Sequence, residues 1–158
     1  MALGTFQIRL IMRELDLNSV TKFLYSFMNE MNLWEIEVHL SYSKCISTGS
    51  GWDQAVELAR EKLECIYDKY LTKKQRKNGR LSGPDVATFP EYDPDLEKIE
   101  QIERLERKII VATKKQDHNM KNYFILCRYI LIEKNGIYLI DTKEIYSSHK
   151  EKWMNRVF

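Results

Sequence analysis

The sequence predicts an α+β protein in which two amphipathic helices precede an antiparallel β-meander. Apolar residues recur at steps of three and four over residues 20–42 and again over residues 56–70, which is typical of helices with one buried face. From residue 109 onward, β-branched and aromatic residues dominate, and these favour strands. Asn135-Gly136 is the preferred sequence of a two-residue hairpin turn. The simplest packing is a curved sheet that wraps the long first helix.

Length and composition favour a single domain over residues 1–158, because a chain of 158 residues can bury a core without disulfides or metal. An apolar content of 44% excludes a disordered chain, and a formal net charge of +2 gives no general attraction to nucleic acid or to a membrane surface. The N-terminal apolar run is interrupted by Gln7, Arg9 and Arg13. We therefore expect neither a signal peptide nor a membrane span, and a cytoplasmic protein.

In the helical half of the chain, one segment fits two alternative structures, and helix boundaries can be predicted at two places. Residues 1–17 fit either a short strand, since apolar residues alternate there, or a helical lead-in. The first helix should fade at the glycine-containing turn of residues 47–51, and Ser50 with Asp53 forms the pattern of a capping box for the second helix. That helix should end near Gln75, where Asn78-Gly79 supplies a stop. Its expected buried stripe is Val56, Ala59, Leu63, Ile66, Tyr67 and Tyr70.

In the β half of the chain, the secondary structure of one segment is ambiguous, and the pairing register of one hairpin can be predicted. Residues 81–95 hold all three prolines and are expected to connect helix to sheet. Residues 96–107 read locally as helix, because their apolar residues lie three apart. Residues 120–132 are apolar on both alternating faces, which predicts a central strand covered on both sides. Counting back from the hairpin turn pairs Leu131 with Ile140 and Tyr129 with Thr142.

Residue types that carry chemistry are few and do not form a known catalytic motif. Glu35 and His39 have the i, i+4 spacing of a metal pair, yet the sequence implies no third ligand, and we expect no metal or cofactor. The basic run of residues 73–80 is better explained by the end of a helix than by nucleic-acid binding. We expect the three cysteines to be reduced core thiols: Cys45, Cys65 and Cys127.

A helix inside a curved sheet can enclose a pocket, which keeps an enzyme as an alternative. Such a small pocket enzyme would be an isomerase, dehydratase or hydrolase with an acid or histidine as general base. Polar-tipped residues could line its pocket, although core residues with satisfied hydroxyls explain them equally well. They are Tyr25, Trp34, Tyr67, Tyr129 and Asp141. A pocket filled by Phe27, Trp34 and Tyr129 would exclude the enzyme.

Several stretches, in order along the chain, carry a resemblance to a known family. They are residues 27–35 (FMNEMNLWE), 72–74 (TKK) with Arg76 and Arg80, 90–94 (PEYDP), 129–131 (YIL) before Asn135-Gly136, 138–144 (YLIDTKE) and 152–153 (KW). This set resembles immunity proteins of bacterial polymorphic toxin systems that have the nuclear transport factor 2-like fold and accompany rearrangement-hotspot (Rhs) toxins. The resemblance implies an α+β cone and no catalysis. It also implies a strand over residues 98–107.

The resemblance implies a function of stoichiometric binding. The protein would neutralise a cognate toxin domain as a monomer or homodimer, with no nucleic-acid or membrane partner. Oppositely charged segments at residues 73–80 and 91–106 suggest where contact occurs. We expect the toxin to contact Phe89, Glu91, Tyr92 and Asp93, with the two aromatic residues exposed. The alternative remains a small pocket enzyme of the same fold, and a third class is a dimeric binding module with an exposed apolar sheet face.

Overall fold

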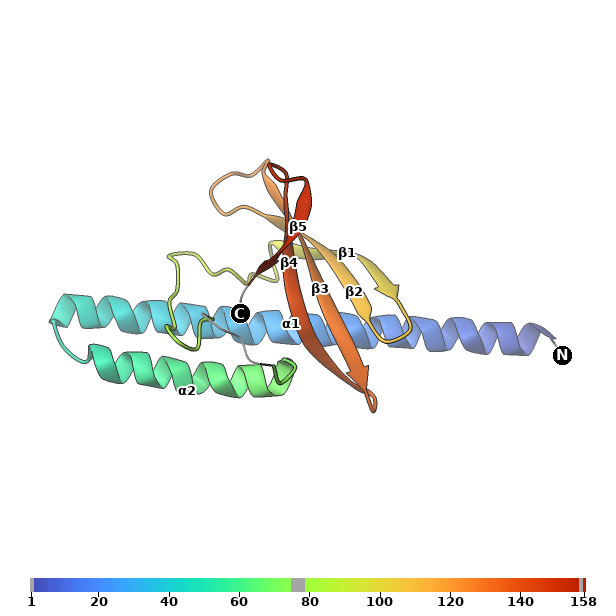
Figure 1. Ribbon diagram of the computed structural model, residues 1–158, viewed down its shortest axis with the longest axis horizontal. Helices are drawn as coiled ribbons and strands as arrows, with labels where there is room; N and C mark the ends of the chain where they lie inside the picture. The colour runs from blue at the N-terminus through green and yellow to red at the C-terminus, as the bar shows by residue number, and fades with distance from the viewer. Residues whose placement is uncertain (1, 75–78, 157) are drawn as a thin grey trace.

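Two helices lie antiparallel to each other, and the sheet crosses the longer one. The computed structural model describes residues 2–74, 79–156 and 158, and describes side chains of the first helix at residue 14 and from residue 16 onward. α1 spans Ala2–Thr48 and α2 spans Trp52–Tyr70. The N-terminal part of α1 extends past the sheet (Figure 1). Residues 2–17 are therefore helical, which decides between the two alternatives. Neither helix, over the described residues, is long and apolar enough to cross a membrane.

Both predicted boundaries of α2 differ from the observed ones. Gly51 is the N-cap residue, with a φ of 80° and no capping side chain, so the predicted capping box is wrong. The Ser50 hydroxyl instead points to Thr48. α2 ends at Tyr70 because Leu71 adopts an extended conformation and bridges to Ile140 of the sheet. Gln75 and Asn78, on which the predicted end depended, lie outside the described residues.

The sheet is an antiparallel meander of five strands in chain order. Its strands are β1 (Glu97–Arg104), β2 (Ile109–Gln116), β3 (Phe124–Lys134), β4 (Ile137–Ser147) and β5 (Lys152–Arg156). β1 confirms the strand implied by the resemblance and shows that the local helix reading was wrong. Pairing with β2, for example Ile102 opposite Val111, outweighs the helical preference of the isolated segment.

The β3–β4 hairpin follows the predicted register for its first half only. Asn135 and Gly136 have φ angles of 53° and 75°, as a two-residue type I′ turn requires. Leu131 pairs with Ile140 as expected, but Ile130 then pairs with Thr142, so Asp141 forms a β-bulge. Tyr129 consequently faces Lys143 rather than Thr142. The bulge places a lysine, 1% exposed, in the interior.

The concave face of the sheet and the apolar stripes of both helices share one core. Phe27 packs edge-to-face against Tyr70, Tyr92 and Phe158, with ring centroids 5.3–6.1 Å apart. Phe158 is buried against the helices, where it contacts Phe27 and Tyr67, and Trp153 in β5 packs on Tyr146. Aromatic side chains therefore fill the interior of the cone.

The other face of the sheet is uncovered, contrary to the prediction for β3. Cys127, Tyr129 and Leu131 are buried, whereas Phe124 and Leu126 on the opposite face are each 44% exposed. Over the described residues, the core lies on only one side of the sheet, so the apolar pattern of β3 does not reflect two covered faces within this chain. Among the free cysteines only Cys127 is a core thiol, because Cys45 is partly buried and Cys65 exposed.

Candidate functional site

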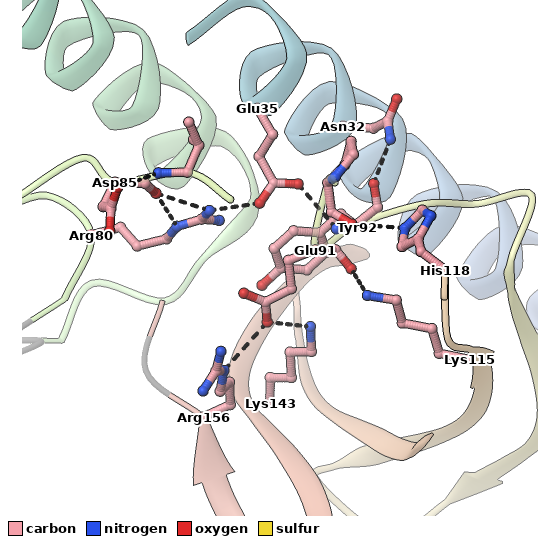
Figure 2. Close-up of polar contacts among 12 residues, drawn as sticks. Asn32, Glu35, Arg80, Asp85, Glu91, Tyr92, Lys115, His118, Lys143 and Arg156 are labelled. Atoms are coloured by element: carbon pink, nitrogen blue, oxygen red, sulfur yellow. Dashed lines mark hydrogen bonds and ion pairs between the residues drawn. The ribbon is translucent and has the colours of Figure 1, made fainter. Parts of the chain in front are cut away.

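A buried ion pair joins α1 to the segment between α2 and β1. The Glu35 carboxylate lies 2.6 Å from Arg80 Nη2, and their side chains are only 2% and 16% exposed. Arg80 also donates to the Asp85 carbonyl from Nε and Nη2, and its guanidinium lies 5.2 Å from the centroid of the Trp34 ring. Burial raises the pKa of Glu35, and Arg80 opposes that shift. Figure 2 shows this pair next to the polar contacts of Glu91 and Tyr92.

The same carboxylate fixes the backbone of Tyr92. Glu35 accepts a hydrogen bond from the Tyr92 N–H at 3.0 Å, and the Asn32 side-chain amide donates to the Tyr92 carbonyl at 2.6 Å. The Tyr92 ring is 2% exposed, and burial raises the pKa of its hydroxyl well above the ordinary value. The expectation of an exposed aromatic at this position is wrong. Its ring instead packs on Phe27 in the core.

Glu91 is the centre of a second charged cluster. Its Oε1 lies 3.2 Å from Lys143 Nζ and 3.4 Å from Arg156 Nε, and its carbonyl accepts from Lys115. Burial alone would raise the pKa of Glu91, but Lys143, Arg156 and Arg80 together lower it to about 2. The Lys143 ammonium also lies 4.0 Å from the centroid of the Tyr92 ring. Glu91 therefore neutralises the buried Lys143 and also pairs with Arg156, which is exposed.

The depressed pKa of Glu91 predicts a loss of stability in acid. A carboxyl whose folded-state pKa is lowered stabilises the fold above the unfolded value, near 4.5, and loses that contribution as the pH falls toward about 2. We expect the Glu91→Gln variant to lose about 2–3 kcal/mol of unfolding free energy at pH 7 and to show a flatter profile between pH 4.5 and 2. Urea unfolding across this range measures it, with Glu64→Gln on the exposed face of α2 as the control. Parallel profiles for wild type and Glu91→Gln would contradict the assignment.

A cleft of about 380 Å³ opens between these two clusters, lined by Glu35, Arg80, Asp85, Val86, Ala87, Glu91, Asn155 and Arg156. The carboxylates of Glu35 and Glu91 are already paired with Arg80, Lys143 and Arg156. In the part of the chain that the structure describes, no three His, Cys, Asp or Glu side chains form a group that could hold a metal ion. The contacts of this cleft orient the connecting segment, and the wall contains no nucleophile paired with a base.

An aromatic pair joins the segment between α2 and β1 to the turn after β2. Phe89 is 48% exposed, as predicted, and stacks on His118 at a centroid distance of 5.0 Å. His118 Nε2 lies 3.2 Å from the Pro90 carbonyl oxygen and 3.8 Å from the Asp93 carboxylate. The Asp93 carbonyl also accepts from the Leu96 and Glu97 amides. Phe89 is thus an exposed ring that stacks on a histidine, and that histidine is itself held by contacts with Pro90 and Asp93.

The predicted pocket residues contact separate partners, apart from Tyr25 and Tyr129, which both contact Glu97. The Tyr129 hydroxyl donates to Glu97 Oε1 at 3.1 Å, and the Tyr25 hydroxyl lies 3.5 Å from the carbonyl oxygen of the same residue. Trp34 donates to the Ala59 carbonyl at 2.9 Å. Tyr67 packs against Phe158, and Asp141 lies on the bulge, where it accepts from Thr72 and Lys74. Phe27, Trp34 and Tyr129 fill the core, which was the condition for excluding a pocket enzyme.

Sequence reasoning missed the charged residues that organise this region. From the sequence, Glu35 is considered as a possible metal ligand and not as a core residue, although it lies four residues after Met31 and three before Val38, both in the buried stripe. That spacing was an available signal. Arg80 belongs to the basic run of residues 73–80, of which Lys73 is exposed. Residues 75–78 of that run lie outside the described residues. No local pattern distinguishes Arg80 from its neighbours.

Comparisons with known proteins identify the family. The family model described as NTF2 fold immunity protein matches residues 19–156. A similar protein is "Immunity protein RhsIA" from Dickeya dadantii (strain 3937), which is 32% identical over 139 residues, covering 88% of this chain and 96% of the relative. No solved structure matches. This is a family of immunity proteins and not of enzymes, and its match covers α1 from residue 19 onward, α2 and the sheet. The chain therefore belongs to the NTF2-fold immunity proteins.

Proposed function

We propose that this immunity protein neutralises a cognate Rhs toxin domain by forming a stoichiometric complex with it. The observation that carries the proposal is the family match over residues 19–156, together with 32% identity to a relative named as an Rhs immunity protein. The filled cone agrees with it, because a core packed with Phe27 and Tyr129 leaves inhibition to the surface. A few central aromatic or arginine side chains would then supply most of the affinity.

The proposal also covers the domain organisation, the oligomeric state and the cellular location of this protein. One core shared by the helices and the sheet supports a single domain over residues 1–158, active as a monomer or homodimer. We place it in the cytoplasm, where an incoming toxin would be met. The most direct genetic test is the neighbouring reading frame: a toxin gene beside this one, lethal unless this chain is co-expressed, would support the assignment. A neighbouring toxin that this chain fails to neutralise would contradict it.

The contact region that we propose includes the rim formed by Phe89 and Asp93, with Glu91 at its inner end. Phe89 offers an exposed ring, and the stack on His118 holds that ring in place, so little side-chain freedom would be lost on binding. Tyr92 contributes by supporting the segment from inside, since its side chain is buried. Glu91 is mostly engaged with Lys143 and Arg156.

Replacing Phe89 with alanine and Asp93 with lysine tests the rim. We expect the double variant to bind the toxin domain at least about tenfold more weakly, because an exposed anchor and a charge are both lost. Calorimetric titration with the purified toxin domain measures this, and survival of co-expressing cells gives a second readout. The control is Leu40→Ala on α1, since Leu40 is also exposed. Wild-type affinity in the double variant would exclude the rim from the contact.

A further inference from the structure

The outer face of the sheet is apolar although it faces solvent. Strand alternation places Leu126, Arg128 and Ile130 on the side opposite the buried Cys127, Tyr129 and Leu131. An antiparallel sheet with one free face normally carries polar residues there. Here Phe124 and Leu126 are each 44% exposed. The apolar residues that predicted a second covering layer thus lie on this face, but no part of the described chain covers them.

Aromatic and cationic residues gather on this outer face at its β3–β5 side. Arg128 opposes Glu144, and Tyr146 opposes Trp153 in the next strand pair. The Arg128 guanidinium lies 4.4 Å from the centroid of the Trp153 ring, and Tyr146 packs edge-to-face on Trp153. Tryptophan, tyrosine and arginine are the residues that most often dominate the energy of protein–protein contacts.

The charges of this face are unbalanced at one end. Arg128 is neutralised by its ion pair with Glu144. Lys98 and Lys114, by contrast, lie directly opposite each other in β1 and β2. Lys98 Nζ donates to the Pro94 carbonyl at 2.9 Å, but within the described chain neither lysine has a carboxylate at ion-pair distance. Lys114 Nζ lies 4.4 Å from the centroid of the Phe124 ring, so Lys114 borders the apolar patch, with Lys98 beyond it in β1. Like charges in opposed positions repel, and a carboxylate from outside would relieve that repulsion.

We propose that this outer face docks the cognate toxin through an apolar patch of the toxin that is bordered by carboxylates. The docking face is defined by Lys98, Lys114, Phe124, Leu126, Arg128, Tyr146 and Trp153. This inference rests on the proposed function and adds to it the main surface and the chemistry of the partner. A second copy of this chain would bring the same lysines to the contact and is therefore the poorer fit.

The docking face and the Phe89 rim lie at the same end of the sheet. Phe89 stacks on His118, which follows Gln116, the last residue of β2, by two positions. Gln116 pairs with Phe124. The turn between β2 and β3 therefore joins the two features, and one toxin surface could cover both.

Two substitutions in the full chain test the docking face. Leu126→Glu places a charge in the apolar patch, and Lys114→Glu reverses a border charge while leaving the patch apolar. The matched controls on α1 are Leu40→Glu and Lys44→Glu, at exposed positions. Affinity for the purified toxin domain is measured by calorimetry at low and high salt. Light scattering after size exclusion reports the oligomeric state, and circular dichroism reports folding.

We expect Leu126→Glu to weaken toxin binding at least about thirtyfold and Lys114→Glu about tenfold, the latter mainly at low salt. Both controls should stay within about twofold of wild type. Wild-type affinity in both variants would overturn the inference and leave the proposed function intact. Loss of a dimer with unchanged toxin affinity would also overturn it, because the occupant would then be a second copy. A wild-type chain that does not bind the toxin at all would refute the proposed function itself.

Discussion

Replacing Tyr92 with alanine is expected to lower the free energy of unfolding by about 3–5 kcal/mol, which is the usual cost of truncating a fully buried aromatic residue. The ring is 2% exposed and packs between Phe27 and the Lys143 ammonium. Truncation would leave a cavity in the core and remove the ring from a buried cation. Since many domains are stable by only 5–15 kcal/mol, the variant should unfold far more easily.

The conservative variant Tyr92→Phe separates packing from contact with the toxin. It keeps the ring and should stay within about 1 kcal/mol of wild type. Urea unfolding gives the stabilities, and toxin titration at a temperature where Tyr92→Ala is still folded gives its affinity. A Tyr92→Ala chain with wild-type stability and lost toxin binding would show that the side chain reaches the partner after all. Reduced stability with retained affinity is the result that we expect.

Features of the fold that depend on local pattern could be predicted from the sequence. The stripe of α1 needs only a spacing of three and four residues, and the hairpin turn needs only Asn135-Gly136, since these residues tolerate the positive φ angles observed. The boundary of α2 could not be found in this way. Leu71 leaves the helix because it pairs with Ile140, and that partner lies far along the chain.

The candidate site was predictable only where exposure follows from local sequence. Phe89, between polar and proline residues, is exposed as expected. Tyr92, three residues later, is buried because Glu35 and Asn32 of α1 hold its backbone and its ring packs on Phe27. The position of Lys143 depends on a bulge at Asp141, which shifts every later side chain to the opposite face. A one-residue irregularity of this kind leaves no periodic signal.

Replacing Arg80 with methionine is expected to cost about 3–5 kcal/mol of unfolding free energy, because it leaves a buried carboxylate without its counterion. Glu35 is 2% exposed and lies 2.6 Å from Arg80, and burial already raises its pKa. Without the guanidinium this carboxyl must stay charged in the interior or take up a proton. The cost should therefore shrink as the pH falls and Glu35 becomes protonated.

A second substitution determines whether the unpaired charge causes that loss. In the double variant Glu35→Gln with Arg80→Met, the glutamine oxygen can still accept from the Tyr92 N–H, which Glu35 accepts at 3.0 Å, while the buried charge is gone. We expect the double variant to recover at least about half of the loss. Lys74→Met serves as the control, because the Lys74–Asp141 pair is 45% and 28% exposed and should be worth about 1 kcal/mol or less. Urea unfolding between pH 5 and 8 compares the four chains. If Arg80→Met and Lys74→Met lost equal stability at every pH, the Glu35–Arg80 pair could not be what fixes the segment between α2 and β1 to α1.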